Sequence, residues 1–160
     1  MSKILILCEK NSVAKDMARV LKCDFENDIN GLKYYENDTF AVSFFRGHLV
    51  GLCEPDEYFS HLKNAPENLT KSGKLKWSAV PLPILPQEYK FTANFGCEKH
   101  LKSVSKLMNS AEFDSLICAT DTGREGELIF RYVYDFANCK KPFKRLWISS
   151  LTDESIENGM

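Results

Sequence analysis

The sequence lacks the features that mark several large classes of protein. No apolar run in its 160 residues approaches the roughly 20 that a helix needs to cross a bilayer. The apolar stretch at residues 4–8 is too short for a signal peptide and has no cleavage site. The six cysteines are scattered without a C-x-x-C pair, which argues against a zinc knuckle. We therefore expect a cytoplasmic protein with no membrane partner.

The chain also lacks a strong net charge of either sign. Its 21 Lys and Arg residues oppose 22 Asp and Glu residues, whereas autonomous nucleic-acid binders are usually basic. Basic residues do cluster at 71–76 and 140–145, where a solvated rim and a phosphate-contacting surface are equally good interpretations. If this chain acts on DNA, we expect other parts of a larger protein to supply most of the affinity.

Strand and helix patterns alternate along most of the chain. Residues 3–8 are continuously apolar, as in a strand buried on both faces, and helical spacing follows Ser12, a candidate N-cap. The remaining patterns predict a hairpin at 33–45, helices at 97–110 and 124–137, strands at 115–120 and 145–148, and a last helix capped near Thr152. This alternation predicts an α/β fold in which helices flank a mostly parallel central sheet.

Residues 53–96 interrupt the alternation. They contain five of the six prolines, which preclude a long helix there, and Trp77, Tyr89 and Phe91 lie among them. We expect a loop-rich insertion packed by aromatic side chains, serving as a lid or a docking surface. The sequence stops at Met160, about two turns into the last expected helix, so we expect a single domain over 1–160 cut from a longer protein.

Acidic residues follow two of the expected strands. Glu9 follows the first, Asp121 follows the strand at 115–120, and Glu125 begins the next helix. Ligands bind at the carboxyl ends of parallel strands, and three carboxylates that converge there repel one another unless a cation such as Mg²⁺ neutralises them. Spacing alone also allows a second interpretation, in which Glu9 is a solvated loop residue, Asp121 caps the helix and Glu125 favours the helix dipole.

The neighbours of these acids have two interpretations each. Arg124 could meet a phosphate or pair with Glu127, and Lys10 could meet a phosphate or pair with an acid beside it. His48 could contact phosphate or could be a hydrogen-bonded structural histidine. Two glycines bracket the acidic turn and would let backbone or phosphate approach closely: Gly123 and Gly126.

Four stretches carry a resemblance to a known family. Residues 119–130, A-T-D-T-G-R-E-G-E-L-I-F, resemble the acidic Toprim motif of type IA DNA topoisomerases, commonly written A-T-D-x-D-R-E-G-E. E-K-N-S-V-A at 9–14, G-H-L at 47–49 and R-L-W-I-S-S-L-T at 145–152 resemble further family motifs, in the same order. The resemblance spans nearly the whole chain, is closest to topoisomerase III-like proteins, and implies a Rossmann-like Toprim fold.

The resemblance implies a reaction and residue roles. Such enzymes cut one DNA strand with a tyrosine, pass another strand through the gap and reseal it without ATP. By analogy, Glu9 is the catalytic acid/base, Lys10 stabilises the phosphate, and Glu9, Asp121 and Glu125 form the site for Mg²⁺, with Mn²⁺ as a substitute. The implied partners are a single-stranded region of DNA and the remaining domains of the enzyme, with two DNA- or phosphate-binding residues here: Arg124 and His48.

The sequence departs from the family pattern in two respects. Gly123 replaces the second aspartate of the motif, which removes one carboxylate, and Asn11 replaces a proline. The nucleophilic tyrosine of the family lies well beyond its first domain, so we expect this fragment alone neither to cleave nor to relax DNA. Two alternatives stay open: a stand-alone Toprim nuclease or maturase, and a non-catalytic Toprim binding module, which Gly123 favours.

Overall fold

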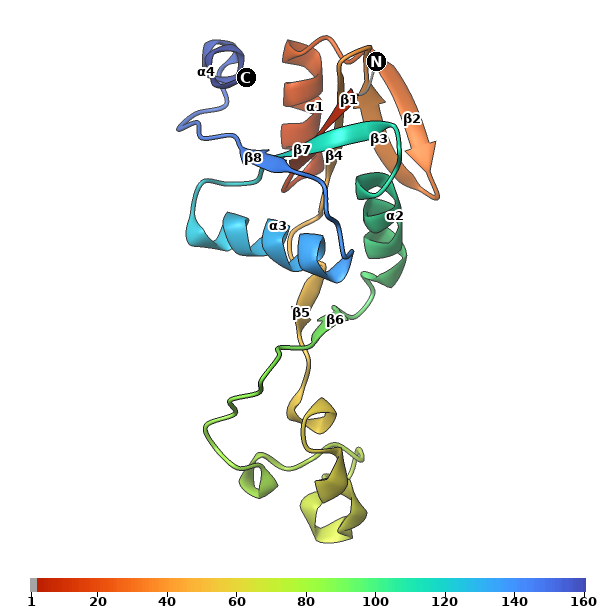
Figure 1. The fold of residues 1–160 in the computed structure, drawn as a ribbon, viewed down its shortest axis with the longest axis vertical. Helices are drawn as coiled ribbons and strands as arrows, with labels where there is room; N and C mark the ends of the chain where they lie inside the picture. Colours follow the sequence, from red (N-terminus) through yellow and green to blue (C-terminus); the bar gives the residue numbers. More distant parts are fainter. Residues whose placement is uncertain (1–2) are drawn as a thin grey trace. The chain divides into compact units, whose positions relative to one another are not determined.

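The structure is a computed structural model that describes residues 3–160. The chain divides into two compact units, one formed by residues up to 50 together with 93–160, and the other by 51–92. Within the described residues, the first unit contains a six-stranded sheet of order β2-β3-β4-β1-β7-β8 (Figure 1). Its strands are β1 (Lys3–Cys8), β2 (Phe25–Ile29), β3 (Leu32–Glu36), β4 (Phe40–Phe44), β7 (Phe113–Ala119) and β8 (Phe143–Arg145).

The centre of this sheet is parallel. β1 pairs in parallel with β4 and β7, and β7 with β8, whereas β2 and β3 are antiparallel to their neighbours. Residues 5–8 of β1 are fully buried, as its unbroken apolar run predicts for a central strand covered on both faces. The predicted fold class, with a mostly parallel sheet and a hairpin at 33–45, is confirmed.

Four helices are described in the first unit: α1 (Asn11–Val20), α2 (Glu98–Met108), α3 (Arg124–Phe136) and α4 (Asp153–Gly159). The hydroxyl of Thr152 accepts a hydrogen bond from the Ser155 amide at 3.3 Å, so the predicted cap of the last helix is confirmed. The prediction that Ser12 caps the first helix is wrong. That helix already begins at Asn11, and its N-cap residue, Lys10, makes no side-chain capping bond.

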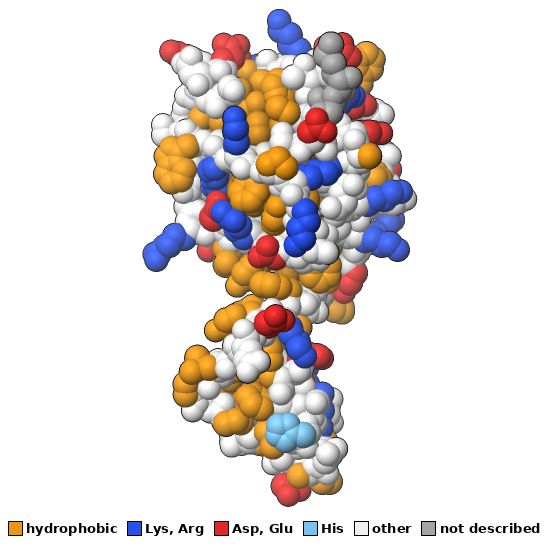
Figure 2. Space-filling view, in the orientation of Figure 1, with side chains coloured by type: hydrophobic (Ala, Val, Ile, Leu, Met, Phe, Trp, Pro, Cys, Tyr) orange, Lys and Arg blue, Asp and Glu red, His pale blue; other side chains and the backbone are white. Residues whose placement is uncertain are grey.

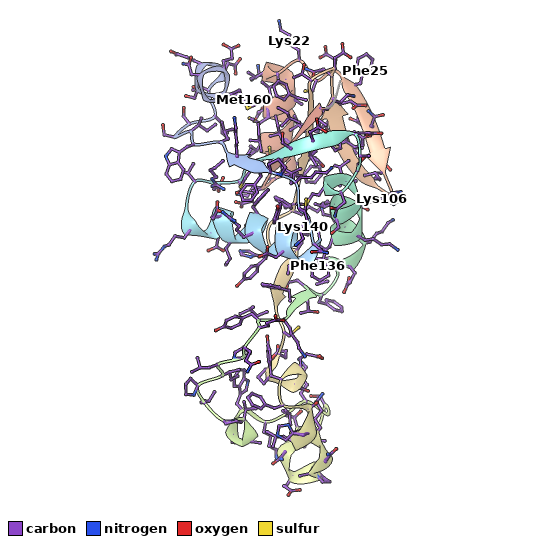
Figure 3. The ribbon with its side chains drawn as sticks, viewed as in Figure 1. Lys22, Phe25, Lys106, Phe136, Lys140 and Met160 are labelled. Atoms are coloured by element: carbon purple, nitrogen blue, oxygen red, sulfur yellow. The ribbon has the colours of Figure 1, made fainter. Side chains whose placement is uncertain are left out.

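Two strands differ from the sequence prediction. β8 covers 143–145 instead of 145–148, because its parallel pairing with β7 runs only from Phe143, opposite Leu116, to Arg145, opposite Cys118. β2 was not predicted, because its sequence F-E-N-D-I is polar and lies at the sheet edge. Phe25 at its start is 71% exposed (Figure 3), so burial provides no alternating pattern there.

The second unit is rich in loops, as predicted for the insertion. Besides parts of the strand pair β5 (Val50–Leu52) and β6 (Phe91–Ala93), it contains short 3₁₀ helices at Pro55–Glu57, Ser60–Asn64, Pro66–Asn68 and Trp77–Ala79. Asp56 ties two of its segments together, because its carboxylate accepts from the Leu75 amide at 3.1 Å and pairs with Lys63 at 2.7 Å. Apolar side chains cover much of the visible face of this unit (Figure 2).

None of the helices in the described part of the chain is both long enough and apolar enough to cross a membrane.

Candidate metal centre at the strand ends

The carboxyl ends of β1 and β7 bring two of the predicted acids to one edge of the sheet. Cys8, the last residue of β1, pairs with Ala119, the last residue of β7. Glu9 follows the first strand directly, and Asp121 lies two residues beyond the second. The two strands are therefore neighbours, as the metal-site hypothesis required. Glu125 lies in the first turn of α3, which starts from the same loop as Asp121.

A tight turn holds Asp121 at this edge. A Cβ atom placed on Gly126 would lie 2.0 Å from the Asp121 carbonyl oxygen, so only glycine fits where α3 crosses the strand end. The Thr120 hydroxyl donates to the Gly126 carbonyl at 2.7 Å and closes the turn. Gly123 differs, because a Cβ atom there would meet nothing within 4 Å and its φ of −77° suits any residue.

Arg145 braces this turn from β8. Its guanidinium donates to the hydroxyl of Thr120 at 2.9 Å, to the carbonyl of Thr120 at 3.0 Å, and also to the carbonyl of Asp121. It pairs with Glu127 at 3.2 Å as well. Sequence reasoning missed this role. It placed Arg145 in a basic cluster for which a solvated rim and a phosphate-contacting surface were equally good interpretations. The one available signal was its place at the start of an apolar, strand-like run.

His48 and Glu125 meet across the edge. The Nε2 atom of His48 lies 2.7 Å from Oε1 of Glu125, with 38% and 79% of the two side chains exposed. The loop that carries His48 is itself tied to the end of β1, because the amides of Arg46 and Gly47 donate to the Glu9 carbonyl at 3.0 and 3.3 Å. The contact between His48 and Glu125 joins residues 77 positions apart, and sequence spacing does not indicate it.

The sequence left two interpretations for Lys10 and for Arg124: contact with a phosphate, or an ion pair with a neighbouring acid. Lys10 Nζ lies 3.5 Å from the Glu9 carboxylate, so Lys10 does pair with its neighbour while 62% of its side chain stays exposed. Arg124 does not pair with Glu127, which binds Arg131 and Arg145 instead. Within residues 3–160, Arg124 has no ion pair or side-chain hydrogen bond, so its exposed guanidinium is free to meet a ligand.

Asp121 does not act as a helix cap. The N-cap position of α3 is Gly123, and no side chain caps it. Asp121 is exposed, and its carboxylate accepts no hydrogen bond within the described residues. The capping interpretation of this acid is therefore wrong, and its carboxylate is available for another partner.

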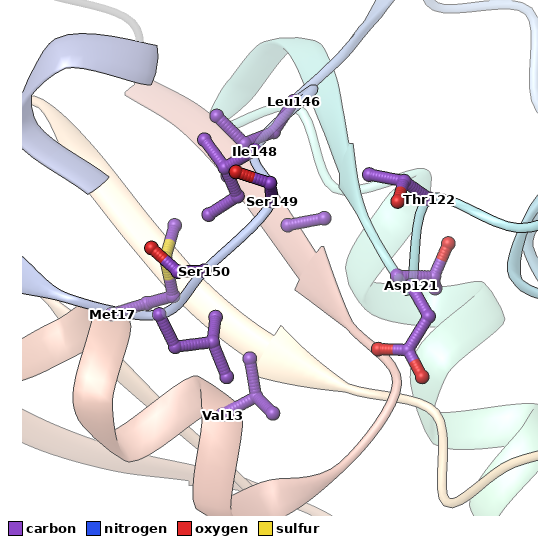
Figure 4. Close-up of a pocket in the computed structure, with 11 residues that line it drawn as sticks. Val13, Met17, Asp121, Thr122, Leu146, Ile148, Ser149 and Ser150 are labelled. Carbon is purple, nitrogen blue, oxygen red and sulfur yellow. The ribbon is translucent and has the colours of Figure 1, made fainter. Parts of the chain in front are cut away.

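A cavity of about 240 Å³ lies beside Asp121 (Figure 4). Val13 and Met17 of α1 line it on one side, and the segment after β8 lines the other with Leu146, Ile148 and two serines. It thus combines an apolar wall with hydroxyl groups next to the exposed acid.

Comparison with known proteins identifies the family of this arrangement. The family model described as the Toprim domain matches residues 4–151. The chain belongs to the Toprim domain family. The Toprim chain is 40% identical over 159 residues to DNA topoisomerase 3 of Bacillus cereus and 38% identical to that of Bacillus subtilis. Each match covers 99% of this chain and 20% of the relative, so the chain spans about a fifth of their length.

A solved structure has the same fold. Full-length topoisomerase I from Thermotoga maritima matches 97% of the Toprim chain and 20% of its own length, with a TM-score of 0.55. Its sequence identity is 18%, so this match shows the fold alone.

The Toprim acids fit one kind of cation site. In the described residues, no group of three or more His, Cys, Asp or Glu side chains is gathered closely enough to hold a metal ion. Mg²⁺, however, prefers oxygen ligands and commonly binds through one or two carboxylates together with waters and substrate phosphates. Asp121 and Glu125, both exposed and four residues apart, fit such a partial set of ligands.

Proposed function

We propose that this chain is the Toprim domain of a bacterial type IA DNA topoisomerase of the topoisomerase III kind, and that it contributes an acidic Mg²⁺ site to a larger enzyme. The observation that carries the proposal is the position of Glu9 and Asp121 at the ends of adjacent parallel strands. The identity of 40% to a DNA topoisomerase 3 over 99% of the chain supports it. Other domains of the enzyme supply most of the DNA affinity.

In the proposed reaction, a tyrosine hydroxyl from another domain gives up its proton to solvent and attacks a phosphorus atom of one DNA strand, and the tyrosine takes a proton back from solvent when the strand is resealed. The bond to the 3′-oxygen breaks and a 5′-phosphotyrosyl link forms, so no ATP is needed for resealing. A second strand passes through the gap, and the 3′-hydroxyl then attacks the link and restores the strand. The net change is topological.

Glu9 serves this reaction as the proton donor and acceptor. The leaving 3′-oxygen needs a proton when the strand is cut, and the 3′-hydroxyl must lose it when the strand is resealed. Only 13% of the Glu9 side chain is exposed, and its backbone carbonyl is held by the 46–47 loop, so the group is well positioned. Lys10, 3.5 Å from the Glu9 carboxylate, places a positive charge beside the same phosphate.

Asp121 and Glu125 would hold Mg²⁺, which when bound offsets negative charge on the phosphate oxygens. His48 acts on Glu125 by orienting its carboxylate through the 2.7 Å contact, which leaves the second oxygen available. The exposed guanidinium of Arg124 binds a phosphate oxygen from the same turn.

The chain by itself lacks the nucleophile in this proposal. Tyr132 and Tyr134 lie on α3, and the hydroxyl of Tyr134 already donates to the Lys141 carbonyl at 2.8 Å. The 160-residue chain should leave supercoiled plasmid unchanged in the presence of Mg²⁺. Relaxation of the plasmid would contradict this part of the proposal.

The decisive test is a Mn²⁺ or Mg²⁺ titration by calorimetry. The wild-type chain should bind saturably, and Asp121→Asn should weaken binding by about tenfold or more, because one unit of charge is lost from the site. Asp114→Asn is the matched control, since Asp114 is an exposed acid at the other end of the same strand, and it should bind like the wild type.

The other outcomes separate the alternatives. Metal-dependent cutting of DNA or RNA by the chain would favour a Toprim nuclease. Absence of metal binding in the wild type, both with and without a short oligonucleotide, would favour a non-catalytic binding module. Equal binding by wild type and Asp121→Asn would place the metal elsewhere and refute the assigned site.

A further inference from the structure

The acids share their edge of the sheet with a group of basic side chains. β4 lies on the other side of β1 from β7 and ends at the same edge, where Arg46 follows it. β3 is antiparallel to β4, so the turn at Asn30 and Gly31 that precedes β3 lies at this edge too. Across the edge, the order is therefore the 30–31 turn, Arg46, Glu9 and Asp121.

A second cavity, of about 320 Å³, opens at the basic end of this edge. Arg46 lines it from the loop after β4, and Lys99 and His100 line it from the first turn of α2. α2 packs near the β2–β3 hairpin (Figure 1), and the Lys99 ammonium lies 3.7 Å from where a Cβ atom on Gly31 would be. Three segments far apart in the sequence thus converge on one concave, polar surface.

The two permanent cations of this cavity are unpaired. Within residues 3–160, neither Arg46 nor Lys99 makes an ion pair or a side-chain hydrogen bond. Two carboxylates lie close to the cavity in sequence, but each accepts from a backbone amide: Asp28 from Gly31 at 2.8 Å, and Glu98 from Gly96 at 3.3 Å. Unpaired cations in a concavity favour an anion.

The backbone that carries Arg46 is strained and rigidly held. Arg46 has a φ of 77°, in the left-handed region that residues other than glycine rarely adopt. Its amide and that of Gly47 both donate to the carbonyl of Glu9. Such strain persists where surrounding structure enforces it, commonly at functional sites, and here it couples the position of Arg46 to that of the proposed acid/base residue.

We propose that this cavity binds a backbone phosphate of the same single DNA strand whose reacting phosphate lies at Glu9 and Asp121. The inference rests on the proposed function and extends it to a second contact. Arg46 and Lys99 match the charge and hydrogen-bonding needs of a phosphodiester. Neighbouring strands lie about 4.8 Å apart, so the ends of β4 and β1 place the two sites within reach of one DNA strand.

His100 reports on the occupancy of the cavity. Its Nε2 lies 3.1 Å from the Phe44 carbonyl, and burial together with the positive charge of Arg46 holds the pKa of the imidazole below its ordinary value. A phosphate bound beside Arg46 adds negative charge next to the ring and should raise the pKa of His100. Proton NMR of the ring measures this shift directly.

The test uses the 160-residue chain and a short thymidine oligonucleotide, with EDTA present so that metal binding does not contribute. Lys99→Gln and Arg46→Gln should each weaken binding by about tenfold and reduce the slope of log affinity against log salt by about 0.7, the value of one single-strand phosphate contact. Lys102→Gln is the matched control, because Lys102 is exposed on the same helix but lines a different cavity. It should bind like the wild type.

Each other result overturns the inference. If Lys99→Gln and Arg46→Gln bind the oligonucleotide as Lys102→Gln does, or if the wild type does not bind at low salt, the cavity is not a DNA contact. If inorganic phosphate at equal concentration raises the pKa of His100 as much as the oligonucleotide does, the cavity takes free phosphate instead. The metal titration with Asp121→Asn tests the proposed function separately, so the two failures are distinguishable.

Discussion

The turn that holds Asp121 and the carboxylates of Asp121 and Glu125 differ in burial and in hydrogen bonding. The turn is called the lower layer, and the two carboxylates are called the upper layer. Below, Thr120 is 4% exposed, Gly126 admits no side chain, and Arg145 donates to two backbone carbonyls. Above, the carboxylate of Asp121 has no partner within the described residues, and 79% of the Glu125 side chain is exposed. We therefore expect the turn to contribute more to the free energy of unfolding than the exposed carboxylates of Asp121 and Glu125 do.

This separation has a physical reason. Buried polar groups must be hydrogen-bonded, or they cost free energy. In the turn, the hydroxyl and carbonyl of Thr120 and the carbonyl of Asp121 all have partners, whereas the Nε atom of Arg145 is buried without one. A metal ligand must instead stay accessible to the ion and the substrate. Substitutions in the lower layer should therefore change the free energy of unfolding, and substitutions above it should change binding.

The largest expected effect is that of Gly126→Ala on stability. The added Cβ would lie 2.0 Å from the Asp121 carbonyl oxygen and 2.9 Å from its carbonyl carbon, and both are backbone atoms that cannot rotate away. We expect a loss of about 3 kcal/mol in the free energy of unfolding, measured by urea denaturation. Gly123→Ala, which meets open space, should cost less than about 1 kcal/mol. If both substitutions lower the free energy of unfolding equally, the steric difference between Gly126 and Gly123 does not control stability.

Arg145→Ala should give the next largest effect. It removes the donors that satisfy two carbonyls of the turn and one partner of Glu127, and we expect a loss of about 2 kcal/mol. Arg131→Ala is the control, because Arg131 also pairs with Glu127, at 2.7 Å, but half of its side chain is exposed. That loss should stay under about 1 kcal/mol. If Arg131→Ala lowers the free energy of unfolding more than Arg145→Ala does, the Arg131–Glu127 pair, and not Arg145, holds the turn.

Gly123→Asp should have the smallest effect on stability. It tests the upper layer instead, because it adds a carboxylate next to the proposed metal ligands. A side chain at this N-cap position meets nothing within 4 Å, and Asp is at least as good as Gly there, so we expect stability within about 0.5 kcal/mol of wild type. If Asp121 and Glu125 hold a cation, the added carboxylate should raise Mn²⁺ affinity about tenfold. Gly123→Asn keeps the cap without the charge, and an equal gain with Asn would refute the electrostatic explanation.

The sequence predicted those parts of the molecule in which local pattern and burial agree. The apolar run at 3–8, the helical spacing in 97–110 and 124–137, and the cap at Thr152 each indicate an element that the structure contains. β2 was not predictable because a polar edge strand has no burial pattern, and the bounds of β8 were not predictable because they depend on which of its residues pair with β7. The Ser12 cap failed because the helix begins at Asn11, with Lys10 at the N-cap position, two residues before the cap that was predicted.

The sequence by itself determined the family and the fold class, because these depend on motifs and on apolar periodicity within short windows, and it supplied the acidic residues on which the proposed metal site rests. Only the tertiary structure decided which groups meet. It made β1 and β7 neighbours, brought His48 to Glu125, turned Arg145 from a surface cation into the brace of the turn, and gathered Arg46, Lys99 and His100 around one cavity. These contacts join distant segments through sheet order and loop geometry, which no local pattern of residues encodes.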